Sequence, residues 1–214
     1  MYNFGKGDKM KITILKQGIH KWNKNKSNIL DEICSTITLL KAENSKEKNI
    51  IIDTGNLGYE DEITKALKKE NLNPEDIDYV INTHSHQDHC SNNYLFRNAK
   101  RIIGKSIWLQ DKSHIQYNSA EDINIPGIKL ISTPGHKPSH ISVIAESDKN
   151  TYVIAGDAIN LQAINSGKAP NQDYIDSTKK ILNTADIIIP GHGPVIKDKK
   201  LEELKKAADQ LEVK

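Results

Sequence analysis

The sequence has few cysteines, and this shortage excludes one common source of stability. Its two cysteines, Cys34 and Cys90, lie far apart and form no CxxC pair, so they do not make a disulfide framework. Cys34 lies inside an apolar run, and we interpret it as a small buried hydrophobic residue. Cys90 directly follows His89, and whether its thiol reaches a metal ion stays open at this stage.

Long apolar runs are also missing. No stretch approaches the roughly 20 residues that a membrane-spanning helix needs, so we expect no membrane partner. The first residues contain no apolar core of a signal peptide, which predicts an intracellular, cytoplasmic protein. A second methionine, Met10, stands directly before the first strand-like run. We therefore expect residues 1–9 to be a dispensable, disordered extension.

Arginine is scarce, and neither sign of charge dominates. All but two of the 30 basic residues are lysines, and the formal net charge is only +2. A nearly balanced charge gives no strong case for nucleic acid as a partner. With 36% apolar and 27% charged residues the chain is typical of a soluble globular protein. No linker or change of composition divides its 214 residues, so we predict a single domain over residues 1–214.

A cluster of ligand-type residues follows the strand-like run at residues 78–82. Three histidines and one aspartate lie within six positions, namely His84, His86, Asp88 and His89. Imidazole and carboxylate suit zinc, iron or manganese. Alternate residues of an extended segment share a face, so the first two histidines can reach one ion together. The alternative is a histidine-rich loop without a ligand role, but four such residues in one short window argue against chance.

A second ion can lie beside the first. If the chain turns into a helix after His86, Asp88 and His89 move toward a second position. Two metal ions roughly 3.5–4 Å apart are the usual arrangement for hydrolysing phosphate, amide or ester bonds. The cluster therefore predicts a hydrolytic site rather than a purely structural one.

Three more strand-end turns carry ligand-type residues. Two prolines and a glycine fix the turn at residues 133–140, where His136 is the better ligand candidate and His140 is better interpreted as a hydrogen-bonding support. Asp157 follows a glycine at a strand end, where a carboxylate can approach a metal closely and can bridge two. His192 lies in the turn Pro-Gly-His-Gly-Pro. Seven candidate ligands thus come from separate rigid turns.

Periodicity predicts an α/β protein. Alternating or continuous apolar runs predict strands at residues 11–15, 33–40, 49–53, 78–82, 101–104, 128–132, 141–144, 151–155 and 185–189. Helical spacing predicts helices at residues 60–70, 91–96, 174–183 and 199–213. We expect loops at residues 17–28 and 158–172 and irregular structure at 105–127. Helices alternate with strands in both halves, which suggests two sheets packed face to face with helices outside.

The end of the run at residues 49–53 has two interpretations. Asp53, followed by Thr54 and Gly55, is common in an ordinary turn after a strand. A buried carboxylate at this point can also orient a histidine of a metal site. The fragment alone does not decide between them.

Five of these segments, in order, resemble the motifs of the metallo-β-lactamase superfamily. They are Asp53-Thr54-Gly55, the cluster at residues 84–89, Thr133-Pro134-Gly135-His136, Gly156-Asp157 and Pro190-Gly191-His192-Gly193. The resemblance covers residues 49–194. It implies a four-layer αββα sandwich with a dinuclear metal site at one edge. Within the superfamily, the linking stretches look most like the branch of metallo-β-lactamase-domain-containing protein 1, relatives of which have been linked to RNA processing.

The resemblance also assigns roles to residues. It implies a first metal held by His84, His86 and His136, and a second held by Asp88, His89 and His192, with Asp157 bridging the two and Asp53 supporting a ligand. The ions would be two zinc ions, although such ligands also accept iron or manganese. A bridging hydroxide would attack the substrate, and Asp88 would act catalytically by orienting it and carrying a proton. No GxSxG motif is present, and no serine or cysteine nucleophile is needed.

Three functions remain open. The first is hydrolysis of a small-molecule ester, thioester, lactone or β-lactam. The second is a ribonuclease or other phosphodiesterase, because Lys21, Lys24 and Lys26 lie near Trp22, and basic and aromatic side chains hold single strands. The third is an iron persulfide dioxygenase, which needs two histidines and one carboxylate. A catalytically dead scaffold is the least favoured, since every ligand position is filled.

Features that the sequence lacks exclude several branches of the superfamily. Only 35 positions separate Asp157 from His192, which leaves no room for the inserted domain of β-CASP nucleases. The glutamate that flavodiiron proteins carry within the histidine cluster is missing, and only about one helix follows His192, against a longer helical region in glyoxalase II. The loops at residues 17–32, 105–127 and 158–172 would set the substrate, and they carry no recognised signature. The oligomeric state is not predicted.

Overall fold

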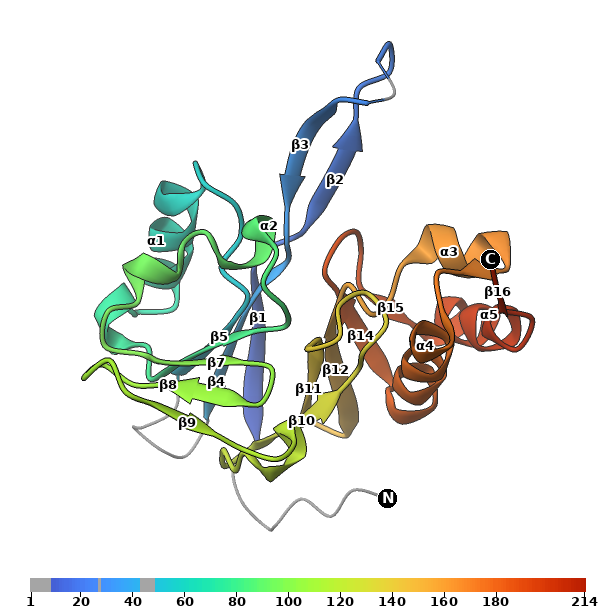
Figure 1. The fold of residues 1–214 in the computed structure, drawn as a ribbon. Coiled ribbons are helices and arrows are strands. Elements are labelled where there is room, and N and C mark those ends of the chain that lie inside the picture. Colours follow the sequence, from blue (N-terminus) through green and yellow to red (C-terminus); the bar gives the residue numbers. More distant parts are fainter. Residues whose placement is uncertain (1–8, 27, 43–48) are drawn as a thin grey trace.

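The computed structural model describes residues 9–26, 28–42 and 49–214. The extension expected at residues 1–9 lies outside the described residues except for Lys9. Two β-sheets pack face to face, and helices cover their outer faces (Figure 1). This arrangement confirms the predicted αββα sandwich.

The larger sheet has seven strands in the order β1-β4-β5-β6-β7-β8-β9. Its strands are β1 Met10–Lys16, β4 Ile37–Ala42, β5 Asn49–Ile52, β6 Tyr79–Asn82, β7 Lys100–Ile103, β8 Ser106–Trp108 and β9 His114–Gln116. The second sheet has five strands in the order β10-β11-β12-β14-β15. These are β10 Ile128–Ser132, β11 Ile141–Ser147, β12 Asn150–Gly156, β14 Ile187–Pro190 and β15 Ile196–Lys197.

The helices fall into two groups. On the outer side of the larger sheet lie α1 Glu60–Lys69 and the 3-10 helices η1 Pro74–Asp76 and η2 Asn93–Leu95, whereas the short α2 Gln87–Cys90 lies at one end of this sheet. On the outer side of the second sheet lie α3 Leu161–Ser166, α4 Gln172–Thr184 and α5 Asp198–Ala208. A third 3-10 helix, η3 Ala120–Asp122, precedes β10. Within the described residues, none of the helices is long and apolar enough to cross a membrane.

Strand β5 shows why the layers form. Successive side chains of a strand point to opposite faces, so a continuous apolar run buries both faces. Ile50 and Ile52 join the core between the two sheets, whereas Ile51 joins the core under α1. All three side chains are fully buried, as the sequence predicts. A third core lies between the second sheet and the helices α3, α4 and α5.

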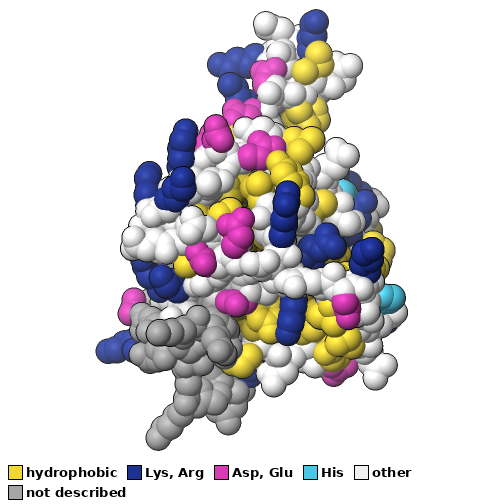
Figure 2. Space-filling model, turned by 90° about the vertical axis from the view of Figure 1, so that its left-hand side faces the viewer, with side chains coloured by type: hydrophobic (Ala, Val, Ile, Leu, Met, Phe, Trp, Pro, Cys, Tyr) yellow, Lys and Arg dark blue, Asp and Glu magenta, His cyan; other side chains and the backbone are white. Residues whose placement is uncertain are grey.

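The prediction of a loop at residues 17–28 is wrong. Strand β2, Ile19–Trp22, pairs antiparallel with β3, Leu30–Cys34, and the two form a hairpin that projects from the body (Figures 1 and 2). We call this hairpin the arm. Cross-strand pairing has overridden the low strand propensity of a polar, lysine-rich segment.

The single strand predicted at residues 33–40 is also interrupted. The chain leaves the arm at Cys34 and enters the larger sheet at Ile37. Between them the backbone N–H of Ser35 donates to the carbonyl of Asp88 at 2.9 Å, and the N–H of Thr36 donates to that of Gly191 at 2.7 Å. The two residues bond to the loops of the candidate site instead of a neighbouring strand, and this divides the run.

Four other predictions need correction. The region expected to be a polar loop at residues 158–172 contains α3, which begins because the Asn160 side chain accepts from the N–H groups of Gln162 and Ala163. The region at 105–127 contains β8, β9 and η3, and the helix expected at 91–96 is only the 3-10 helix η2. The helix predicted at 199–213 ends at Ala208, since β16, Glu212–Val213, pairs with β13, Lys168–Ala169.

Candidate metal centre

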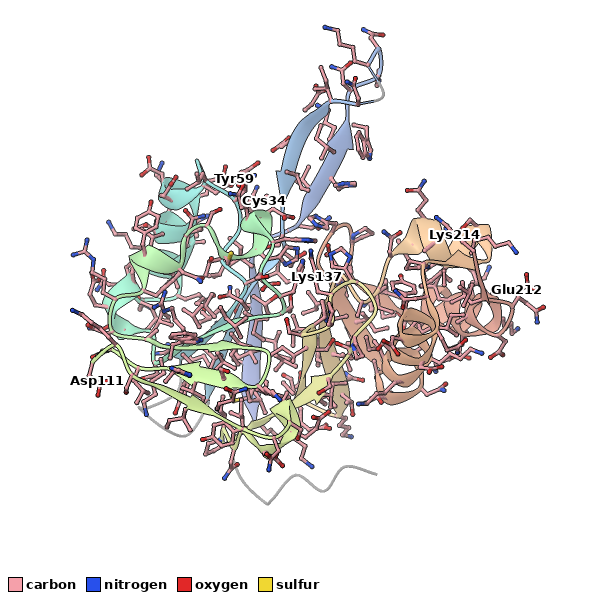
Figure 3. All side chains as sticks on the ribbon, viewed as in Figure 1. Cys34, Tyr59, Asp111, Lys137, Glu212 and Lys214 are labelled. Atoms are coloured by element: carbon pink, nitrogen blue, oxygen red, sulfur yellow. The ribbon has the colours of Figure 1, made fainter. Side chains whose placement is uncertain are left out.

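Five strands end at one edge of the sandwich, and the candidate ligands follow them. Strands β5 and β6 run parallel, as do β12 and β14, so their carboxyl ends share an edge. The turn after β10 reaches the same place, where Figure 3 labels Lys137 beside the meeting point of the two sheets. The structure brings together all seven side chains that the sequence predicts as ligands.

The first group consists of His84, His86, His136 and Asp157. Their four ligand atoms lie within 4.8 Å of one another. The Nδ1 atom of His86 is 2.9 Å from Nε2 of His84 and 3.0 Å from Nε2 of His136. Four ligands arranged tetrahedrally about zinc at ~2.0–2.1 Å stand roughly 3.3 Å apart. The spacing of these nitrogens therefore suits one cation between them.

The second group consists of Asp88, His89 and His192, whose ligand atoms also lie within 4.8 Å of one another. The Oδ2 atom of Asp88 is 3.2 Å from Nε2 of His192 and 3.5 Å from Nε2 of His89. The sequence left open whether a helix follows His86; the structure has α2 beginning there, at Gln87, and this turn moves Asp88 and His89 away from the first group.

Asp157 stands between the two groups. Its Oδ2 atom is 3.4 Å from Nε2 of His136 in the first group. Its Oδ1 atom is 3.3 Å from Nε2 of His89 and 3.5 Å from Nε2 of His192 in the second. Each oxygen thus faces a different group, which is the geometry that a bridging carboxylate requires.

Protonation favours metal binding in the first group. Burial lowers the pKa of His84, His86 and His136 below the ordinary value for histidine. Their imidazoles are therefore neutral near pH 7, and a neutral ring nitrogen is the form that binds a metal. Burial alone would raise the pKa of Asp157, but the imidazole of His89, whose Nε2 atom is 3.3 Å from Oδ1 of Asp157, and the nearby His192 lower it. The carboxylate is ionised.

Carboxylates surround the two histidines of the second group. Burial alone would lower the pKa of His89, yet the carboxylates of Asp53 and Asp157 raise it well above the ordinary value. Burial would likewise lower the pKa of His192, but its hydrogen bond to Asp88 and the charge of Asp157 raise it. The same carboxylates would stabilise a cation.

One nitrogen in the second group lacks a satisfied partner. The Nε2 atom of His89 is fully buried and makes no hydrogen bond in the described structure, although two carboxylates stand near it. A buried polar atom without a partner is costly, and a cation between His89, Asp88 and His192 would remove that cost. The residues present therefore fit a metal ion.

Asp53 determines which nitrogen of His89 points into the centre. Its Oδ2 atom is 2.7 Å from Nδ1 of His89, and it also accepts from the hydroxyl of Thr83 at 2.8 Å. An ionised carboxylate only accepts, so Nδ1 carries the proton and Nε2 presents its lone pair. The backbone of Asp53 has a φ of +56°, a strained value for a residue with a side chain. Of its two interpretations, the histidine support is the one that the structure favours.

The turn at His192 depends on a glycine. A Cβ atom on Gly191 would come within 2.2 Å of Oδ1 of Asp157 and 3.0 Å of Cε1 of His89. Any side chain here would push Asp157 away from the second group. The Pro-Gly-His-Gly-Pro turn therefore allows the backbone to approach the centre closely.

The arm holds His192 from the other side. The Nδ1 atom of His192 donates to the carbonyl of Ile19 at 3.1 Å, and the N–H of Gly193 donates to the carbonyl of Gly18 at 3.1 Å. A carbonyl only accepts, so this bond leaves Nε2 of His192 as the free ligand atom. The sequence gives no signal for this contact, because any residue at position 19 would supply the same carbonyl.

His140 and Cys90, whose roles the sequence did not settle, lie outside both groups of ligand atoms. His140 is fully buried, its Nδ1 atom is 2.9 Å from the hydroxyl of Thr133, and its ring stacks on His84 with centroids 5.1 Å apart. Burial lowers the pKa of His140 to about 3, so it supports His84 as a neutral ring. The thiol of Cys90 donates to the carbonyl of His86 at 3.1 Å instead of joining the ligand atoms. Cys34 is a buried hydrophobic residue, as expected.

Sequence reasoning missed some supporting residues. Thr83 bonds to Asp53 through both its backbone N–H and its hydroxyl, and Thr36 bonds to Gly191. Asn82 donates from its side chain to the carbonyl of His89 at 2.9 Å. Thr83 stands beside the histidine cluster, so its position was an available signal. Asn82 also lies close to the cluster in sequence, whereas Thr36 acts through a contact with a distant segment.

Comparison with known proteins agrees with this geometry. The family model described as the metallo-beta-lactamase superfamily matches residues 35–117. A protein named as a metallo-hydrolase from Methanocaldococcus jannaschii is 35% identical over 158 residues, which cover 71% of this chain and 74% of that protein. The chain belongs to the metallo-β-lactamase superfamily.

Other superfamily members are also similar to the chain. Metallo-beta-lactamase domain-containing protein 1 of Xenopus laevis is 28% identical over 88% of this chain and 82% of that protein, which confirms the expected branch. An N-acyl homoserine lactonase of Bacillus cereus is 32% identical over 44% of this chain and 43% of its own. A solved metallo-beta-lactamase structure from Thermotoga maritima superposes with a TM-score of 0.69 at 21% identity, covering 89% of this chain and all of that one. Membership makes the chain a metal-dependent hydrolase that binds a divalent metal.

Proposed function

We propose that the chain hydrolyses an ester, thioester, lactone or β-lactam bond of a small molecule at a dinuclear, zinc-containing centre. The observation that carries the proposal is Asp157, whose two oxygens face two separate groups of ligand atoms. Two bound cations supply Lewis acidity and make hydroxide available from water near neutral pH. The lactonase among the relatives supports the choice of an acyl substrate.

The side chains of the centre differ in exposure, and this determines where a substrate can enter. His86, His136 and His192 are partly exposed, whereas His84 and His89 are fully buried. The open side of the centre therefore lies over these three partly exposed histidines, and the substrate enters there. Asp53 and the Ile19 carbonyl hold His89 and His192 in the tautomers that bind a cation.

Asp88 is the proposed acid–base residue. Burial alone would raise its pKa, but the hydrogen bond and the charges of His192 and His89 lower it. The carboxylate is therefore ionised and able to accept a proton from the attacking water. Its side chain is 12% exposed, which leaves it within reach of a substrate.

The two alternatives are less well supported. A persulfide dioxygenase needs one iron and a set of two histidines and one carboxylate. The second group, Asp88, His89 and His192, would then have no role. A ribonuclease would use Lys21, Lys24 and Lys26, which lie on the exposed arm.

The test of the proposal is a substrate panel with two variants. The purified protein is assayed against a lactone, a thioester, an aryl ester, a β-lactam and single-stranded RNA. We expect turnover of at least one acyl substrate, and loss of at least ~10³-fold in His86→Ala and Asp157→Asn, because each removes a cation ligand. Circular dichroism should show that both variants stay folded.

His114→Ala is the matched control, because this exposed histidine lies in β9, outside both ligand groups. Its activity should equal that of the unaltered protein. Unchanged rates in either ligand variant, or cleavage of RNA alone, would contradict the proposal.

A further inference from the structure

The arm carries two aromatic rings on one face. His20 and Trp22 alternate along β2, and alternate residues of a strand share a face. Their ring centroids lie 5.5 Å apart with an interplanar angle of 83°, an edge-to-face contact. Ile33 lies opposite His20 in the strand register, which adds an apolar side chain to the same face.

This face continues into the metal centre. The His20 ring lies 5.3 Å from the ring of His192, centroid to centroid. The rings of His192, His20 and Trp22 therefore form an unbroken line from the second group of ligands outward along the arm. A substrate bound at the centre has this line of rings as its neighbour.

Two charged residues of the arm, Lys21 and Glu32, lie on the other face. Lys21 alternates with His20 and Trp22, and it stands opposite Glu32 in the register. Glu32 accepts from the hydroxyl of Tyr59 at 2.6 Å, which directs that face toward the start of α1. The face beside the centre is therefore aromatic and apolar, without a lysine between the rings.

The two rings are available for binding. Trp22 is 49% exposed, and His20 is exposed as well. Among the residues that the structure describes, neither ring forms a hydrogen bond or an ion pair through its side chain. An exposed tryptophan beside a candidate active site has apolar area to lose on binding a substrate.

We propose that His20 and Trp22 bind the extended apolar acyl portion of the substrate and so determine its specificity. This inference rests on the proposed function. It narrows the substrate class to esters or thioesters of long-chain or aryl-substituted acids. The scissile carbonyl would lie at the centre, and the acyl chain would run past His20 to Trp22. Polyanions such as RNA do not match this face, because no lysine lies between its rings.

The first test compares two 4-nitrophenyl esters, octanoate and acetate. We expect Trp22→Ala and His20→Ala to lower kcat/KM for the octanoyl ester about tenfold more than for the acetyl ester. Trp108→Ala and His114→Ala are matched controls, since this second Trp–His pair stacks on β8 and β9, away from the centre. The control variants should leave both rates unchanged. Equal losses for the two esters in the Trp22 variant would overturn the inference.

The second test needs no turnover. The chain has two tryptophans, so Trp108→Phe leaves Trp22 as the single fluorophore. We expect octanoate, the acid product of the longer ester, to shift the Trp22 emission to the blue in a saturable titration, and acetate to have no effect. No response to octanoate would overturn the inference. If octanoate binds but no ester is hydrolysed, the proposed function fails while the binding face stands.

Two other occupants of the face are distinguished in the same experiment. A blue shift that grows with protein concentration alone would mean that a second copy of the chain covers Trp22. Quenching by single-stranded RNA, with no response to octanoate, would mean that the arm binds nucleic acid. Either result would overturn the assignment to an acyl chain.

Discussion

The hydrogen bond between Asp53 and His89 shows how one residue controls a ligand that it does not replace. The 2.7 Å contact fixes the proton on Nδ1 of His89 and leaves Nε2 for a cation. The same carboxylate holds Thr83 through both its backbone and its hydroxyl. Asp53 therefore connects the end of β5 to the start of the histidine cluster.

Replacing Asp53 should affect the second group more than the first. In Asp53→Asn the amide can donate to Nδ1, which favours the wrong tautomer of His89. We expect metal affinity at the second group and activity each to fall by about 10–100-fold, the usual effect of losing a hydrogen-bonding partner of a metal ligand. Elemental analysis by mass spectrometry should find that the variant loses the ion of the second group before that of the first, which leaves one ion per chain.

Asp78→Asn is the control for this change, because Asp78 accepts from the backbone of Asn49 at the start of β5 and lies outside the ligand groups. It should retain both ions. Full metal content and activity in Asp53→Asn would show that the tautomer is fixed by something else.

At this scale the ligands were predictable and their supports were not. His84, His86, Asp88 and His89 lie within six positions, so local spacing alone brings them together. The carbonyl of Ile19 supports His192 across 173 positions of sequence, and a backbone atom leaves no trace in residue identity. Contacts of this kind become visible only when the chain is folded.

Among the elements, the arm has the closest connection to the centre. Its first leg bonds to the Gly191–Gly193 turn through Gly18 and Ile19, and Ser35 and Thr36 at the end of its second leg bond to Asp88 and Gly191. Both legs thus hold the backbone that carries ligands of the second group. Movement of the arm would move those ligands.

Gly18→Ala tests this connection. A Cβ atom on Gly18 would come within 2.1 Å of the carbonyl of Gly191 and 2.7 Å of the N–H of Thr36, so the arm must shift away from the turn. We expect a loss of about 1–3 kcal/mol in the free energy of unfolding, typical of overpacking. We also expect selective loss of the second ion, measured by mass spectrometry and by denaturant titration.

Gln17→Ala is the neighbouring control, since Gln17 is exposed. It should change neither stability nor metal content. If Gly18→Ala retains both ions, the position of the arm does not control metal binding at the second group, which would contradict this account.

The elements were predicted best where burial decided them. Strands β5, β6, β10 and β14 are short apolar runs, and the sequence locates each of them within about two positions of its observed bounds. Strand β2 of the arm and α3 were expected to be loops because their sequences are polar. Pairing with β3 stabilises β2, and the Asn160 cap stabilises the start of α3. Neither contact produces a periodic pattern of apolar residues in the sequence.

For the whole molecule, the centre joins the two halves of the sandwich. The larger sheet supplies His84, His86, Asp88 and His89, and the second sheet supplies His136, Asp157 and His192. Each group contains members from both sheets. Cations held by these groups would therefore cross-link the sheets in the folded state only.

Removing the metal should lower the stability of the entire fold. A ligand that binds only the folded state stabilises it by about 4 kcal/mol at a free concentration 1,000 times its Kd. We expect a chelator to lower Tm by several degrees, and added zinc to restore it. His192→Ala should show a smaller response to the chelator, because one group is already weakened. Calorimetry that finds the same Tm with and without chelator would contradict this cross-link.

The fold class was predictable from the sequence because five motifs occur in order, each at the end of a strand. The substrate was not, because the segments that face the open side of the centre owe their shape to pairing and packing rather than to a motif. The arm is the example, since its alternation of His20 and Trp22 has meaning only once β2 is known to be a strand.

The central claim is that seven side chains hold two cations with Asp157 between them. Anomalous diffraction from a crystal of the zinc-loaded protein, measured on both sides of the zinc absorption edge, tests it most directly. The account predicts two anomalous peaks about 3.5–4 Å apart, one in each ligand group, with one Asp157 oxygen beside each. A single peak in the first group, or a peak outside both groups, would contradict it.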